Sequence, residues 1–121
     1  MESTTLQERR RINDEIERIA IMCMDFASDY DTWSETDRGA ALLDIYEGFF
    51  HSFTRLVRYT RNLPQLRKSE TEIDAATNWL KQKGDINDDK KLKSRLEKGT
   101  TIFDSYMKLL ADQGVVFPPS R

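Results

Sequence analysis

Residues 5–30 read TLQERRRINDEIERIAIMCMDFASDY. Apolar side chains recur in this stretch at steps of four and three residues, at Ile12, Ile16, Ile19, Cys23, Phe26 and Tyr30. That spacing keeps them on one side of an α-helix. Thr5-Leu6-Gln7-Glu8 fits a capping box, in which the Thr5 hydroxyl accepts from the Glu8 backbone N–H and the Glu8 carboxylate reaches back. We therefore expect a long first helix that begins at residue 5 and ends near residues 28–31.

A second helix is predicted to follow Ser34-Glu35-Thr36-Asp37, because acidic residues suit the positive end of a helix dipole. Its apolar positions are Leu42, Leu43, Ile45, Tyr46, Phe49, Phe50, Phe53, Leu56 and Val57, with Thr60 in the same period. A helix so broadly apolar packs against more than one neighbour. It is expected to stop at Asn62-Leu63-Pro64, because the residue before a proline is pushed out of the α region.

Two further start signals predict a short third helix and a long fourth one. Ser69-Glu70-Thr71-Glu72 fits another capping box and precedes Ile73, Ala76, Leu80 and Lys83, with Gly84 as terminator. Asn87, Asp88 and Asp89 open the fourth helix, which is expected to end at Gly114. Its apolar side is Leu92, Leu96, Gly99, Phe103, Tyr106 and Leu110. Glycine costs about 1 kcal/mol relative to alanine inside a helix, so a break at Gly99 is left open.

These patterns predict an all-α fold, a four-helix bundle with three long helices, a short third helix and a short apolar C-terminal tail. The chain of 121 residues is expected to form one helical domain over 1–121. Val116 and Phe117 in the tail either cover the open end of the bundle or, stiffened by the prolines that follow, offer an extended segment to a partner.

Composition excludes several classes of protein. Cys23 is the only cysteine, so no disulfide framework exists. No apolar run approaches the roughly 20 residues that cross a bilayer, and the first residues lack the apolar stretch of a secretory signal. We therefore expect a cytoplasmic protein that does not bind membranes.

Candidates for catalysis are few. Asp44, Glu47, His51 and Arg55 form one line along the second helix, opposite its main apolar face. A solvated stripe of i,i+4 pairs is favoured there over a polar partner contact or a metal or catalytic site. Cys23 lies on the apolar side of the first helix and is interpreted as a core residue. We expect no enzymatic activity, cofactor, metal or small-molecule substrate.

The charge of −2 hides an uneven distribution along the chain. Residues 1–50 carry 12 acidic and 5 basic side chains, whereas residues 51–121 carry 9 acidic and 14 basic ones. The cations of interest are Arg55, Arg58, Arg61, Lys81, Lys83, Lys90, Lys91, Lys93, Arg95 and Lys98. They either solvate helix faces, bind the phosphates of a polyanion, or meet acidic faces of partners or other copies head to tail.

Two hypotheses about function follow. The favoured one is a non-enzymatic helical interaction module, a small subunit or adaptor in a larger assembly, with a protein partner or self-association. Its partner-binding residues are Ile21, Met22, Met24, Val116 and Phe117, because an outward Ile beside two flexible Met suits an adaptable contact. The alternative is sequence-independent binding of a nucleic-acid backbone by the basic 55–98 region within a nucleoprotein complex. In fold alone, such a module is similar to CRISPR effector small subunits.

Overall fold

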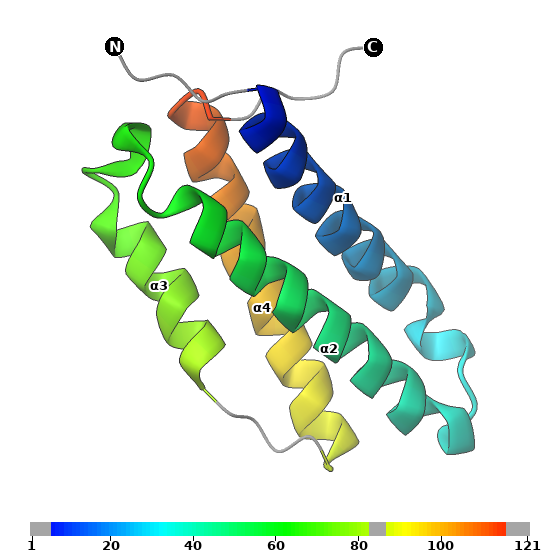
Figure 1. The fold of residues 1–121 in the computed structure, drawn as a ribbon. Coiled ribbons are helices and arrows are strands. Elements are labelled where there is room, and N and C mark those ends of the chain that lie inside the picture. The colour runs from blue at the N-terminus through cyan, green and yellow to red at the C-terminus, as the bar shows by residue number, and fades with distance from the viewer. Residues whose placement is uncertain (1–5, 83–86, 116–121) are drawn as a thin grey trace.

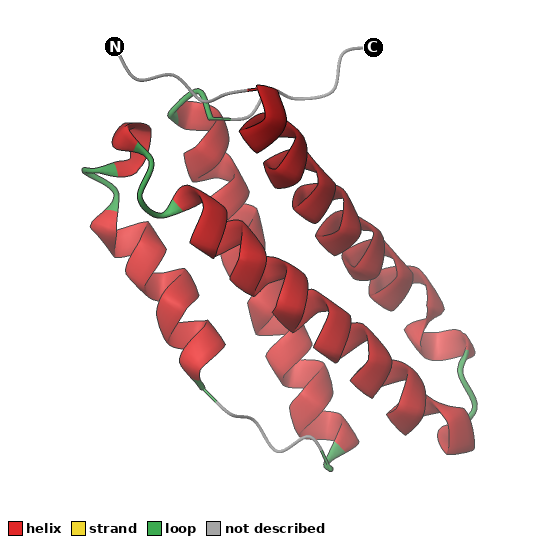
Figure 2. Ribbon diagram, viewed as in Figure 1, coloured by secondary structure: helices red, strands yellow, loops and turns green. Residues whose placement is uncertain are grey.

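The computed structural model describes residues 6–82 and 87–115, which form helices joined by short loops (Figures 1 and 2). The α-helices are α1 (Leu6–Asp29), α2 (Glu35–Thr60), α3 (Glu70–Lys81) and α4 (Asp89–Asp112). Two single 3₁₀ turns, η1 (Tyr30–Thr32) and η2 (Pro64–Leu66), lie in the connections after α1 and α2. The predicted all-α bundle of three long helices and a short third one is confirmed.

The helix α2 occupies the centre of the bundle. Figure 1 shows α1 along one side of α2 and α3 along the other, with α4 behind them. This position explains why the apolar arc of α2 is so wide, since a helix that contacts several neighbours needs more than one apolar stripe. The predicted features at Thr5, Lys83, Gly84, Val116 and Phe117 lie outside the described residues.

The helix starts follow local side-chain chemistry in two places. Ser34 caps α2 by accepting from the Asp37 backbone N–H at 3.2 Å, and Asp88 caps α4 by accepting from the Lys90 N–H at 3.0 Å. The capping box predicted at Ser69 is wrong, although α3 begins there. Ser69 has φ −111° and ψ 36° and makes no side-chain cap, because this backbone is not the extended one that aims a cap hydroxyl at the helix.

The end of α4 depends on a glycine, as predicted. Gly114 has φ +70°, a left-handed conformation that glycine adopts without a Cβ penalty. The Val115 N–H donates to the Leu110 carbonyl at 2.8 Å and the Gly114 N–H to the Ala111 carbonyl at 3.1 Å, which is the Schellman arrangement. The side chain of Val115 is buried, so the first residue of the predicted tail closes the end of α4.

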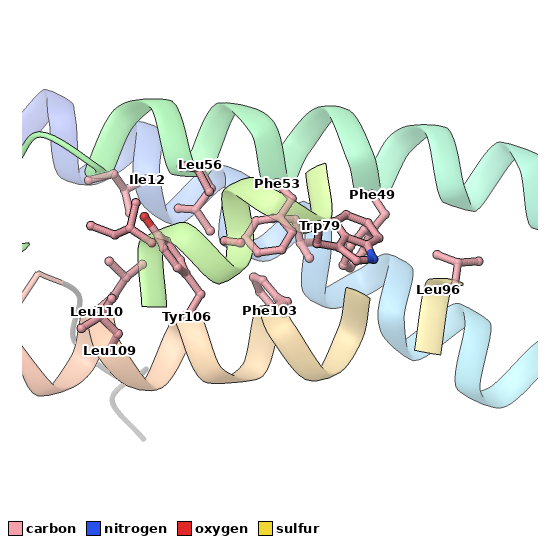
Figure 3. Packing of buried hydrophobic residues seen from close by; sticks show 14 of the residues in the cluster. Ile12, Phe49, Phe53, Leu56, Trp79, Leu96, Phe103, Tyr106, Leu109 and Leu110 are labelled. Atoms are coloured by element: carbon pink, nitrogen blue, oxygen red, sulfur yellow. The ribbon is translucent and has the colours of Figure 1, made fainter. Parts of the chain in front are cut away.

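Aromatic rings from three helices fill the middle of the bundle (Figure 3). Phe49 of α2 meets Trp79 of α3 edge to face with ring centroids 5.4 Å apart, and Phe53 meets Phe103 of α4 at 5.7 Å. Such edge-to-face pairs add to the stabilisation from burial alone. Trp79 is 2% exposed and is a core residue that the expected apolar side of α3 did not include.

The helix α4 runs unbroken through Gly99, which is buried against Trp79. A Cβ placed on Gly99 would lie 2.5 Å from Cζ2 of Trp79 and 3.0 Å from Cε1 of Phe49. The glycine therefore makes room for the indole ring and does not interrupt the helix.

A buried hydroxyl pair joins α2 to α4. The Tyr106 hydroxyl lies 2.6 Å from Oγ1 of Thr60, which donates to the Leu56 carbonyl at 2.7 Å, so Tyr106 is the donor of the first bond. Burial raises the pKa of the Tyr106 hydroxyl. The pair satisfies two polar groups that are otherwise surrounded by apolar side chains.

We expect Thr60→Val to lower the free energy of unfolding by about 1.5 kcal/mol, because it leaves the Tyr106 hydroxyl buried without an acceptor. Tyr106→Phe removes the donor itself and is expected to cost less, about 0.5–1 kcal/mol. Thr54→Val is the matched control, since among the described residues the Thr54 hydroxyl hydrogen-bonds within its own helix, to the Phe50 carbonyl. Urea unfolding measures all three, and equal losses for Thr60→Val and Thr54→Val would contradict the assignment.

Candidate docking groove

The apolar side chains predicted on the outside of α1 divide between two environments. Ile21 and Met24 are 57% and 68% exposed. Met22 is half-buried and turns toward α2, where its sulfur lies 2.6 Å from the position of a Cβ on Gly48. Ile21 and Met24 thus face outward, whereas Met22 belongs to the contact between α1 and α2.

Arg55 is engaged in a contact between α2 and α1. Its Nε donates to Oε2 of Glu15 on α1 at 3.0 Å, and Arg18 donates to the same oxygen at 3.0 Å. Glu15 is only 4% exposed. Burial acts to raise the pKa of the Glu15 carboxyl, but the hydrogen bonds and charges of Arg55 and Arg18 outweigh it and hold the pKa below its ordinary value of 4.5. Arg55 therefore joins α2 to α1 and departs from the solvated stripe predicted along α2.

Arg95 of α4 is also used within the fold. Its guanidinium donates to the Tyr46 hydroxyl at 2.8 Å, to the Trp79 carbonyl at 2.8 Å and to the Gln82 carbonyl. Its Cζ lies 4.6 Å from the centroid of the Trp79 ring, in cation–π range. The last carbonyls of a helix lack the usual i+4 donors, and the Trp79 carbonyl accepts from the Gln82 N–H at 3.2 Å as well as from Arg95. Arg95 thus adds donors at the end of α3 and joins it to α2 and α4.

The other cations of α4 are distributed differently. Lys93 is half-buried, with Nζ 4.8 Å from the centroid of the Tyr30 ring and 4.0 Å from Oε2 of Glu97. Lys90, Lys91 and Lys98 are exposed on α4, and Lys83 lies outside the described residues. The predicted basic region thus contains arginines that join helices to one another, Arg55 and Arg95, as well as exposed lysines.

Three of its cations, however, meet at one place. Between α2 and α3 there is an open groove with a volume of about 360 Å³. We call it the cationic groove, and it is lined by Phe50, Thr54, Val57, Arg58 and Arg61 of α2 and by Thr77, Leu80 and Lys81 of α3.

The floor and rim of the cationic groove have different chemistry. Phe50, Val57 and Leu80 supply apolar surface, and the hydroxyls of Thr54 and Thr77 are occupied by carbonyls of their own helices at 2.8 Å. Arg58, Arg61 and Lys81 are exposed, and within residues 6–82 and 87–115 no carboxylate lies at ion-pair distance from any of the three. An apolar floor edged by available cations suits an amphipathic, negatively charged ligand.

The three cations of the groove are among those predicted from the sequence, whereas its apolar lining was not predicted as part of a site. The signal was present: Phe50, Thr54, Val57 and Arg61 follow one another at steps of four, three and four along α2. Because α2 is apolar over a wide arc, the sequence did not separate this edge from the core-facing side.

The remaining candidates stay apart from one another. Asp44, Glu47 and His51 are exposed along α2. In the part of the chain that the structure describes, no three His, Cys, Asp or Glu side chains converge so as to hold a metal ion. Cys23 is half-buried with its Sγ 3.7 Å from Oγ1 of Thr100, and burial raises the pKa of its thiol.

None of the helices in the described ranges has both the length and the apolar character needed to cross a membrane. Comparisons of the chain with models of protein families, with curated proteins and with solved structures found no match.

Proposed function

We propose that this chain is a non-enzymatic helical interaction module, a small cytoplasmic subunit or adaptor that binds an acidic amphipathic helix of a protein partner in the cationic groove. The observation that supports this proposal is the combination of an apolar floor with three exposed cations. Helix-in-groove recognition uses apolar anchors at i, i+3 or i+4 and i+7 of the bound helix. In such a complex the anchors would lie on Phe50, Val57 and Leu80, and glutamates beside them would meet the rim.

Binding of a nucleic-acid backbone is less well supported by the same residues. Backbone binding needs several cations free to neutralise phosphates. Arg55 is paired with Glu15, and Arg95 donates to carbonyls at the end of α3. Arg58, Arg61 and Lys81 border an apolar floor, which provides no hydrogen-bond donor to a phosphate. An acidic helix uses both the cations and the floor, so a protein partner is favoured.

Fluorescence anisotropy with a labelled synthetic peptide tests the proposal. The peptide spans about four helical turns and carries leucine at i, i+4 and i+7 with glutamate on either side. We expect binding in the micromolar range, which Arg58→Glu/Lys81→Glu weakens about tenfold or more because like charges then face each other. Single-stranded poly(dT) serves as the competing probe.

Lys98→Glu/Lys108→Glu is the matched control, because it makes the same change of net charge on α4, outside the groove lining. Its affinity for the peptide is expected to stay within about twofold of the unmodified protein. Equal weakening by the control and the groove variant would overturn the proposal. Tighter binding of poly(dT) than of the peptide, lost in the groove variant, would replace it with the nucleic-acid function.

A further inference from the structure

The outer face of α1 has the chemistry that the cationic groove requires of a ligand. Glu17, Ile21, Met24 and Asp25 lie at i, i+4, i+7 and i+8, which places them on one side of the helix. All four are exposed, and Ile21 and Met24 are the large apolar side chains of this face. We call these four residues the α1 key. They form two apolar anchors with a carboxylate at each end.

The key is short enough to lie within the length of the groove, and its charge is opposite. At a rise of about 1.5 Å per residue, Glu17 and Asp25 are about 12 Å apart along α1, and Phe50 to Arg61 spans about 16 Å along α2. The two carboxylates of the key are opposite in charge to the three cations of the groove. Ile21 and Met24 are apolar, as is the floor of the groove. The same charge division appears along the chain, whose first 50 residues are acidic on balance and the rest basic.

The key of one molecule cannot dock in the groove of the same molecule. Figure 1 shows α1 and α3 on opposite sides of α2, so α2 separates the helix that carries the key from the groove between α2 and α3. A contact between them must join two molecules. Since the two surfaces differ, the contact is heterologous, and each molecule in a pair keeps one free key or one free groove.

We propose that the partner bound in the cationic groove is a second copy of this chain, whose α1 key docks there and extends the assembly head to tail. This inference rests on the proposed function of the groove. Because the contact combines a small apolar area with exposed charges, the association is concentration-dependent and weakens as salt rises.

Complementary variants test the inference by sedimentation velocity. The key variant is Ile21→Gln/Met24→Gln, and the groove variant is Arg58→Glu/Lys81→Glu. The unmodified protein is expected to increase in mass with concentration, and each variant alone to sediment as a monomer. An equal mixture is expected to form a dimer and nothing larger, because the key variant keeps its groove and the groove variant keeps its key.

The control Lys98→Glu/Lys108→Glu is expected to associate like the unmodified protein. Raising the salt concentration from about 50 mM to 500 mM is expected to weaken the self-association of the unmodified protein about tenfold. All substituted side chains are exposed, and circular dichroism checks that each variant keeps its helix content. A monomeric unmodified protein, association of the groove variant alone, or a mixture that stays monomeric would each overturn the inference. If the acidic peptide still binds in those cases, the proposed function stands with a different partner.

Discussion

Gly99→Ala is expected to lower the free energy of unfolding by about 2 kcal/mol, against the usual effect of this substitution in a helix. Alanine normally stabilises a helix by about 1 kcal/mol relative to glycine. At this position its Cβ would lie 2.5 Å from Cζ2 of Trp79. The indole is held by Phe49, Phe53 and Arg95, so it has little freedom to move, and a clash of this kind costs about 3 kcal/mol. Urea unfolding at constant m-value measures the difference.

Gly48→Ala is the matched control for Gly99→Ala. Its Cβ would also meet a side chain, but the neighbour is the sulfur of Met22, the flexible end of a chain that can turn aside. We expect no loss, or a gain of up to about 1 kcal/mol from helix propensity. Trp79→Phe, which removes the outer ring, is expected to recover part of the cost of Gly99→Ala in the double variant. If Gly99→Ala stabilises the protein as much as Gly48→Ala does, the result would contradict the close contact described between Gly99 and the Trp79 ring.

Arg55→Met is expected to lower the free energy of unfolding by about 2 kcal/mol at pH 7. Removing one partner of a fully buried ion pair costs about 3–5 kcal/mol, because the other charge stays buried. The Arg55 side chain is 38% exposed, so solvent screening reduces the expected loss. The long apolar stem of Met preserves the packing of the Arg55 methylenes, so the measurement isolates the charge.

The loss caused by Arg55→Met is expected to depend on pH. The pKa of Glu15 is lowered in the folded protein, so this carboxylate contributes stability above its ordinary pKa of 4.5, which is lost as pH falls through the lowered value. Once Glu15 is protonated, Arg55 no longer has a buried charge to compensate. The difference between variant and unmodified protein is therefore expected to shrink as pH falls below about 4.5.

Arg18→Met provides the control for this prediction. Arg18 donates to the same Glu15 oxygen at the same distance of 3.0 Å, but its side chain is 55% exposed and it lies on the same helix. Exposed pairs of this kind contribute about 0.2–1 kcal/mol. Equal losses for Arg18→Met and Arg55→Met, or a loss for Arg55→Met that does not change between pH 7 and pH 3, would contradict the role given to Arg55.

The helices were predictable because their signals are local. Ser34 and Asp88 are the caps observed, the stop before Pro64 and the left-handed Gly114 fall where expected, and the apolar period of α4 is buried as predicted. Each signal depends on residues within about one turn of one another, so no knowledge of the neighbouring helices is needed.

The pairing of side chains between helices was not predictable in the same way. Periodicity defines the side of α3 that faces the core but not which helix it meets, so neither the burial of Trp79 nor its fit against Gly99 followed from the pattern. The same holds for the long cations. Arg58 and Arg95 have the same residue type, and only the fold shows that one edges an open groove while the other binds the end of α3.

The contacts of Arg95 have a consequence for whatever occupies the groove. One wall is a helix of only 12 residues, and an isolated helix of that length is marginal in water. Its last carbonyls are held by a residue that takes no part in lining the groove. Arg95 thus helps to fix the position of α3 relative to α2 and so the width of the groove. A substitution of Arg95 is expected to weaken binding of the occupant by changing that width, although Arg58, Arg61 and Lys81 stay in place.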